Sequence, residues 1–368
     1  MPTPFRIEVV TTHARFEALR DPWDQLADHH PTPLLRHAWF TAAARRFSPR
    51  AELAVVLAWE GERLRAAAPL VQHREGGITR LRLLGFQSDE PEAFLHDDPE
   101  ALAEVCAAVV RLSRPVVLRR LDGASPELAL LQAAHHGRGL STLRLASTRT
   151  HCNPIPRDFA ALEAAMAPKK RKEIGRHRKA LEQLGALTFD VAAPRPEGVD
   201  PLFDAFVALE GAGWKGQAGT ALSHDAPQRA FLRDVCASAA AEDRLRFFFL
   251  RQDGRPIAAQ LHLQCAGKLW TLKIAYDDTL SKYSPGALLT HEVLRHACAH
   301  GLTGFEHLGV AEVWQRRWPV EAREHATLRL YPITPSAAVA LTSDTLQFVQ
   351  RRRARSQALP LSDSAAAA

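Results

Sequence analysis

The sequence lacks a long hydrophobic run, a paired cysteine spacing and a leader pattern at its start. No apolar stretch approaches the about 20 residues that a helix needs to cross a bilayer. The N-terminus MPTPFRIEVV has no basic segment followed by an apolar one. The five cysteines are scattered without a CxxC spacing, which argues against a disulfide framework and against a zinc ribbon. We therefore expect a protein of the cytoplasm without a membrane span.

Motifs of metal, nucleotide and hydrolase chemistry are missing or wrongly placed. His291 and His296 resemble an HExxH pair, but their five-residue spacing puts the two imidazoles on different faces of a helix. His296 and His300 share a face without an evident third ligand, so the sequence predicts no metal site. The GxGxxG match at 211–216 follows a helical pattern instead of a strand, so we reject a dinucleotide fingerprint. Walker A and GxSxG motifs are absent.

The positive charge of the chain is concentrated in two places. The formal net charge is +6, and much of the excess lies in Lys169–Lys179 and in Arg351, Arg352, Arg353 and Arg355. Such clusters can bind phosphate groups, acidic proteins or RNA, although a solvated helix face is the simpler interpretation. An acidic or RNA partner at Lys169–Lys179 therefore remains open.

A pattern of secondary structure occurs twice along the 368 residues. The stretches 52–86 and 244–276 each indicate three antiparallel strands joined by tight turns that contain glycine. Each is preceded by helical segments and followed by a helix and another strand. The following helices and strands are expected at 99–112 and 115–120 in the first half, and at 285–299 and 304–310 in the second.

The repeat predicts an α/β (α+β) chain with two successive domains, each a mixed, mostly antiparallel sheet flanked by helices. We expect the first domain at 1–150, a linking basic helix within 151–185 and the second domain at 186–335. Residues 336–368 are expected to form a basic, partly disordered tail with one short helical stretch.

The helix expected at 285–299 begins in a way that suits a phosphate ligand. Ser284 fits the N-cap, Pro285 fits the first helical position, and Gly286 leaves the backbone amides accessible. A helix that starts directly after a strand can bind a pyrophosphate through its free amides and its dipole. The first copy's helix instead follows the acidic segment 96–100, so we interpret the first half as a degenerate copy that forms a wall or lid.

This order of elements resembles the acyl-CoA-binding core of the GNAT superfamily. The second half resembles more closely the acetyltransferase-like domain of proteins associated with bacterial cellulose biosynthesis. The resemblance is carried by Glu210 with Trp214-Lys215, by Pro256–Ala259, by Ala275–Asp277, by Ser284–Leu289, by Gly301, by Leu308-Gly309 and by Glu312, Trp314 and Trp318. It implies tandem GNAT-like domains. The family's pyrophosphate loop is replaced here by Lys282–Ala287.

The resemblance implies transfer of an acyl group, in the first place acetyl, from acetyl-CoA or another acyl-CoA to an amine of a small molecule or peptide. It places catalytic roles on Glu210, Tyr276 and Trp214, with Glu306 and His307 as weaker candidates for the base. A backbone N–H near Ala275–Asp277 is expected to stabilise the thioester oxyanion. The expected contacts of acyl-CoA are Ala275, Tyr276, Lys282, Ser284, Gly286, Ala287 and Leu288.

Two alternatives remain. One is a non-catalytic tandem adaptor that binds an acidic partner. The other is a Fem-type transferase, a distant relative that uses aminoacyl-tRNA and carries a long helical hairpin in its second domain. Only one such helix is legible here. The sequence leaves the acceptor, the acyl chain length and the oligomeric state open.

Overall fold

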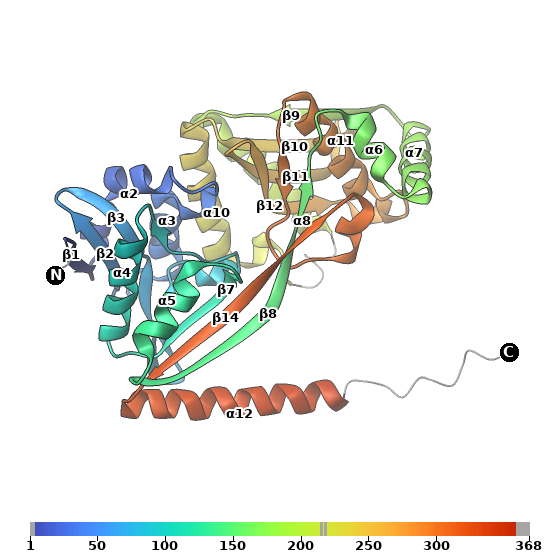
Figure 1. Cartoon of the computed structure of the whole chain (residues 1–368). Coiled ribbons are helices and arrows are strands. Elements are labelled where there is room, and N and C mark those ends of the chain that lie inside the picture. Colours follow the sequence, from blue (N-terminus) through green and yellow to red (C-terminus); the bar gives the residue numbers. More distant parts are fainter. Residues whose placement is uncertain (1–3, 214–215, 217–218, 358–368) are drawn as a thin grey trace.

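The computed structural model describes residues 4–213, 216 and 219–357, with side chains up to residue 350. Its strands form two sheets (Figure 1). The small sheet contains, in order, β1 (Arg6–Val10), β2 (Val55–Glu60), β3 (Arg63–Ala68) and β6 (Leu95–His96). The large sheet contains, in order, β4 (Leu70–Glu75), β5 (Ile78–Leu83), β7 (Val116–Asp122), β14 (Glu321–Pro332), β8 (Gly139–Pro154), β13 (Gly304–Glu306), β12 (Lys268–Tyr276), β11 (Arg255–Cys265), β10 (Leu245–Gln252) and β9 (Leu187–Ala192).

Helices flank both sheets, and the predicted fold class is confirmed. The helices are α1 (His13–Glu17), α2 (Arg20–Ala27), α3 (His37–Phe47), α4 (Pro99–Arg111), α5 (Pro126–His135), α6 (Phe159–Ala165), α7 (Pro168–Glu182), α8 (Val199–Ala212), α10 (Ala226–Ala241), α11 (Pro285–Ala299) and α12 (Pro335–Gln357). One hydrophobic core runs through both halves, because α3 packs on α10 and the Trp39 ring lies 4.9 Å from that of Phe231. In the described residues, no helix is both long and apolar enough to cross a membrane.

The second meander forms as predicted, and the strand that follows it sets the geometry of the site. β10, β11 and β12 pair antiparallel in succession. β13 then runs parallel to β12, but their pairing ends at Trp270 opposite Glu306. From Thr271 to Tyr276 no strand in the described part of the chain pairs with this edge of β12. The sheet is therefore splayed at this point.

The first meander differs from the prediction in its middle strand. Pro69 interrupts it, so β3 belongs to the small sheet while β4 pairs with β5 in the large one. Proline has no N–H to donate to a ladder, which is why the strand changes sheet at this residue. The rest of the first copy follows the prediction, with α4 followed by β7 parallel to β5.

Two long strands, β8 and β14, join the halves, and the sequence did not predict β8. β14 comes from the end of the chain, yet it lies between β7 and β8. β8 is rich in polar residues (GLSTLRLASTRTHCNP) and mostly exposed along its first part, so it lacks the apolar alternation of a half-buried strand.

Two helical segments also differ from the expectation. The linking helix is divided into α6 and α7 where Met166 and Ala167 leave helical geometry ahead of Pro168, because the residue before proline avoids the α region. α12 continues through the basic segment to Gln357 and is thus longer than the short helix expected in the tail. Residues 358–368 lie outside the described part of the chain.

Candidate functional site

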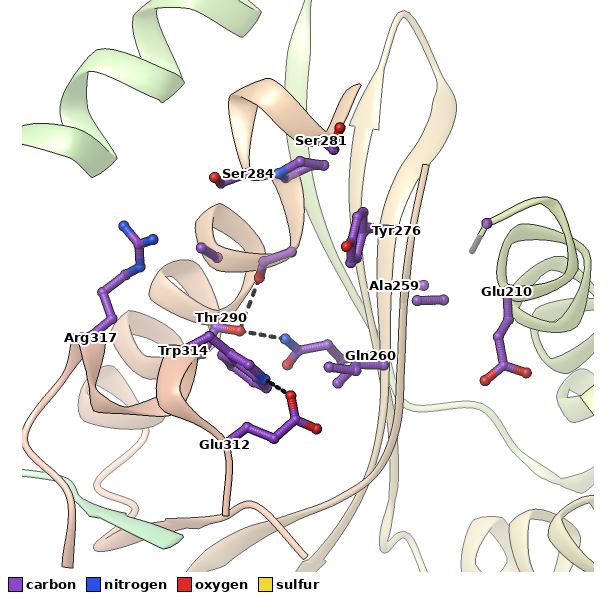
Figure 2. Close-up of a pocket in the computed structure, with 16 residues that line it drawn as sticks. Glu210, Ala259, Gln260, Tyr276, Ser281, Ser284, Thr290, Glu312, Trp314 and Arg317 are labelled. Atoms are coloured by element: carbon purple, nitrogen blue, oxygen red, sulfur yellow. Dashed lines mark hydrogen bonds between the residues drawn. The ribbon is translucent and has the colours of Figure 1, made fainter. Parts of the chain in front are cut away.

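A cavity of about 560 Å³ opens where β12 and β13 separate (Figure 2). It is lined by Glu210, Gly213, Ala259, Gln260, Ile274, Ala275, Tyr276, Ser281, Ser284, Pro285, Gly286, Ala287, Thr290, Glu312, Trp314 and Arg317. In Figure 2, Glu210 lies on one side of the strands that carry Ala259 and Tyr276, and Thr290 and Trp314 lie on the other. The cavity therefore reaches both faces of the sheet past the unpaired edge of β12.

The backbone of β12 offers a donor at this edge. The amide of Asp277 donates to the Ile257 oxygen at 2.9 Å, and Ala275 lies opposite Ala259 in the same ladder. Because N–H groups alternate in direction along an antiparallel strand, the Tyr276 amide is directed to the side away from β11. Of the three amides expected to stabilise an oxyanion, Tyr276 has the appropriate direction.

The N-terminus of α11 meets the same cavity without a side-chain cap. Ser284 precedes the helix with φ of 51°, and its hydroxyl makes no capping hydrogen bond. Among the described residues, the Gly286 amide has no hydrogen-bond partner. A Cβ at Gly286 would lie 3.3 Å from Cδ1 of Tyr276, so a larger side chain would enter the space between helix and strand. An anion can approach the Gly286 amide because this position has no side chain.

The equivalent helix of the first half is closed. Asp98 is the N-cap of α4, and its Oδ1 accepts hydrogen bonds from the amides of Glu100 at 2.8 Å and Ala101 at 3.0 Å. Arg65 also donates to Asp98 at 3.0 Å. The amides that could receive a phosphate are thus occupied by a carboxylate of the chain itself.

The structure brings together five of the seven residues expected to contact acyl-CoA. Ala275, Tyr276, Ser284, Gly286 and Ala287 line the cavity. The other two do not. Lys282 is exposed, with its ammonium 4.8 Å from the ring centroid of Tyr283, and Leu288 is buried in the hydrophobic core under α11.

Glu210 lies in the last turn of α8. Its side chain is buried, and Oε2 accepts a hydrogen bond from the Leu222 amide at 2.9 Å. It still lines the cavity from the face opposite α11. Trp214, which the sequence suggested as its neighbour in catalysis, lies outside the described residues.

The two weaker candidates for the base have structural partners and do not line the cavity. Glu306 accepts hydrogen bonds from Lys268 at 2.9 Å and from both terminal nitrogens of Arg323. His307 is buried against Asn153, with 2.6 Å between Nε2 and Oδ1. Burial, and secondarily His151, lowers the pKa of His307 to about 3, so this imidazole is neutral at ordinary pH.

Sequence reasoning missed a buried polar chain that ends at the cavity. Gln260 donates to the Thr290 hydroxyl at 2.7 Å, and that hydroxyl donates to the Gly286 carbonyl oxygen at 3.0 Å. His262 contacts the Gln260 oxygen at 2.9 Å, and burial lowers the pKa of His262 to about 3. Polar residues that alternate with apolar ones along a strand usually mark its solvated face, whereas Gln260 and His262 are almost completely buried. These hydrogen bonds hold the start of α11 in place.

The cavity obtains positive charge from a residue that the sequence did not single out. Arg317, in the short helix η6 (Val313–Arg317), lines it and pairs with Glu173 of α7 at 3.3 Å. Glu312 and Trp314 of the same segment also line it, and the Trp314 indole donates to Glu312 at 2.7 Å. In the described part of the chain, no group of three or more His, Cys, Asp or Glu residues could hold a metal ion.

Comparison with known proteins agrees with this geometry. Residues 168–316, which include α7, α8, the meander and α11, match the family model of an acetyltransferase (GNAT) domain. This part of the chain is therefore similar to GNAT-type acetyltransferase domains. No curated protein matches the chain.

Solved structures share the fold over most of the chain. The crystal structure of FemX is similar with a TM-score of 0.58 at 10% identity, over 88% of this chain and 96% of that one. The C-terminal domain (DUF2156) of a lysylphosphatidylglycerol synthetase assigned in Agrobacterium fabrum gives 0.53 at 11% identity, over 91% and 97%. A conserved protein of unknown function from Bacteroides thetaiotaomicron gives 0.51 at 12%, over 89% and 99%.

Proposed function

We propose that the second half of the chain, in the domain expected at 186–335, transfers an acyl group from acyl-CoA to an amine. The observation that carries this proposal is the meeting of two open backbone groups in one cavity. The uncapped start of α11 is at Gly286, and the unpaired edge of β12 is at Tyr276. A thioester joined to a pyrophosphate needs both groups, one for the phosphates and one for the carbonyl.

The residues divide the work between the two faces of the sheet. On the α11 side, the Gly286 amide and the helix dipole hold the pyrophosphate, and Arg317 adds a positive charge. At the edge, the Tyr276 amide donates to the thioester oxygen and stabilises the oxyanion of the tetrahedral intermediate. From the opposite face, Glu210 accepts a proton from the amine before or during its attack on the thioester carbon. The thiolate of CoA then leaves.

The donor and acceptor follow from the same geometry and from the resemblance to acetyltransferase-like domains of cellulose-biosynthesis proteins. Acetyl-CoA is the first donor to test, as a substrate without a metal. The acceptor is an amine of a small molecule or peptide that reaches Glu210. All five cysteines are free thiols, which suits the cytoplasm as the compartment.

A second candidate is transfer from aminoacyl-tRNA, and the surface of α7 favours it. Lys169, Lys172, Arg176 and Lys179 are all exposed on this helix. The first three line a groove together with Glu173, and Glu173 is paired with Arg317 of the cavity. A basic surface joined to an acyl-donor cavity fits a donor that carries a nucleic acid. If these four basic residues of α7 bind only an acidic partner, the protein is the non-catalytic adaptor of the first alternative.

The experiment compares donors on the full chain. Acetyl-CoA should raise the melting temperature in a concentration-dependent way, because a ligand that binds only the native state stabilises it. Acetyl transfer to a panel of amines should follow. Stabilisation by aminoacyl-tRNA but not by uncharged tRNA or acetyl-CoA, with aminoacyl transfer, would replace the proposal with the second candidate. Binding without transfer from either donor would favour the adaptor.

A further inference from the structure

A second cavity, which shares no lining residue with the first, lies at the other end of the large sheet. It has a volume of about 200 Å³ and lies against β5, β7, β14, β8 and α12. Its lining is Glu75, Arg80, Arg82, Val117, Arg119, Arg120, Arg144, Ser147, Thr148, Thr327, Arg329, Asp344 and Gln347. We call it the arginine cleft, because six of these residues are arginines and two are carboxylates.

The floor of the arginine cleft contains buried guanidinium groups. Arg80, Arg82 and Arg120 are 3%, 7% and 2% exposed. Among the described residues, Nε of each of them and Nη1 of Arg120 are buried without a hydrogen-bond partner. Burial lowers the pKa values of Arg82 and Arg120, which shows that desolvation of these cations is not fully offset.

The nearby carboxyl groups do not neutralise this floor. The nearest approach between Arg82 and Glu75 is 3.9 Å, and the Glu75 side chain is half exposed. Glu92 lies behind the floor, but burial raises its pKa to about 8, so it is protonated at neutral pH. Glu90 is engaged by the Gly309 amide at 3.0 Å. Burial also raises the pKa of Glu90. Buried cations whose neighbouring carboxyl groups are protonated, exposed or engaged elsewhere indicate a place for an external anion.

Asp344 of α12 shows how an anion can sit at one end of the arginine cleft. Its two oxygens accept from the two terminal nitrogens of Arg80, each at 2.8 Å. The Tyr331 hydroxyl donates to the same carboxylate at 2.6 Å, and Arg329 lies 3.6 Å away. This arrangement occupies both terminal nitrogens of Arg80. Arg82 lies 3.9 Å from the Phe86 ring centroid and has only the distant Glu75 as an acid, and Arg120 donates one terminal nitrogen to the Gly309 carbonyl oxygen.

The rim allows entry from solvent. Arg119 and Arg144 are exposed, and strand register places Arg82, Val117 and Arg329 side by side across β5, β7 and β14. Planar guanidinium groups arranged in this way match the oxygens of a phosphate. The volume corresponds to roughly six or seven water molecules. It admits one or two phosphate groups and excludes the body of a macromolecule.

We propose that the arginine cleft binds a small phosphate-bearing molecule, with Arg82 and Arg120 as the buried contacts and Arg119 and Arg144 at the entrance. The ligand occupies the space beside Asp344, whose carboxylate competes with it for Arg80 and Arg329. The arginine cleft is separate from the first cavity, because the two share no lining residue.

Inorganic pyrophosphate is the probe, titrated into the full chain by calorimetry at constant ionic strength. The wild type should bind it in the micromolar to millimolar range. Arg144→Gln should weaken binding about fivefold or more through loss of a charge-assisted contact. Arg149→Gln is the matched control: Arg149 is also exposed on β8, but it pairs with Glu324 outside the cleft. It should leave the affinity unchanged.

A second variant tests the role of Asp344. Asp344→Asn removes the competing charge and should tighten pyrophosphate binding about fivefold. No binding to wild type or to Asp344→Asn at millimolar pyrophosphate would overturn the proposal. Equal weakening by Arg144→Gln and Arg149→Gln would also overturn it, since it would show a general charge effect.

Discussion

Glu90 accepts a hydrogen bond from the backbone amide of Gly309 at 3.0 Å, although the two residues belong to opposite halves of the chain. Arg120, also from the first half, donates to the Gly309 carbonyl oxygen. The segment that follows Gly309 carries Glu312 and Trp314, which line the donor cavity. Two residues of the first half therefore hold the backbone at the start of the segment that lines the cavity in the second half.

Loss of the hydrogen bond between Glu90 and the Gly309 amide should affect the rate of acyl transfer more than folding. Glu90→Ala leaves the Gly309 amide without its partner, which costs about 1–3 kcal/mol of unfolding free energy. We expect kcat/KM for acyl transfer to fall about tenfold, because the cavity wall is no longer fixed. Glu62→Ala, at an exposed turn of the same half, is the control. Unchanged kcat/KM in Glu90→Ala would show that the wall is positioned without this bond.

Glu210 is the proposed base, and its replacement separates chemistry from binding. Glu210→Gln keeps an oxygen that can accept from the Leu222 amide, so the melting temperature and the acyl-CoA affinity should be retained. The transfer rate should fall about 100-fold. Glu312→Gln changes a carboxylate that lines the same cavity and serves as the control. Near-normal turnover of Glu210→Gln would remove Glu210 from the mechanism.

Local sequence signals predicted the second half well. The glycine turns at 253–254 and 266–267 predicted the meander, and the Ser-Pro-Gly helix start predicted α11. Glycine and proline give such signals because they determine the conformation of their own backbone. Five of the expected donor contacts follow from that local geometry.

The features that the sequence did not predict depend on contacts between residues that are far apart in the sequence. β14 lies between β7 and β8 through pairings between segments that are far apart in the sequence. The sequence alone indicates a solvent-facing Gln260, because its partner Thr290 lies on another element. It likewise indicates a surface charge at Arg317, because the partner Glu173 lies on α7. Side-chain partners that are far apart in the sequence leave no periodic signal.

Glu92 predicts a pH dependence of stability. Its buried carboxyl accepts from the Arg119 amide at 2.8 Å, and burial raises its pKa to about 8. An unfolded glutamate titrates near pH 4.3. Between about pH 4.5 and 8 the unfolded chain releases a proton that the folded chain keeps, so the free energy of unfolding falls as pH rises.

Glu92→Gln should remove this dependence. The variant should be more stable than the wild type at pH 8 by about 1–4 kcal/mol, and the difference should vanish near pH 4. Urea unfolding at several pH values measures it. Parallel stability curves for the two proteins would show that Glu92 is already ionised in the fold.

The four exposed basic residues of α7 should contribute to the binding of polyanions but not to the rate of acyl transfer. Neutralisation of Lys169, Lys172, Arg176 and Lys179 together should weaken RNA or heparin binding and reduce its salt dependence. Turnover of acetyl-CoA with a free small amine should stay within about twofold, since none of the four lines the donor cavity. Filter binding and a coupled assay test the two parts. A collapse of turnover in a folded variant would place these four residues in the active site.

The most direct test of the account is calorimetric titration of acetyl-CoA into the wild type and two variants. Gly286→Asp puts a carboxylate at the uncapped start of α11, as Asp98 does in the first half, and should weaken binding about 100-fold. Asp98→Asn keeps a capping side chain at α4 and should leave the affinity unchanged. Equal losses in the two variants, or no binding of acetyl-CoA to the wild type, would contradict a donor site at Gly286.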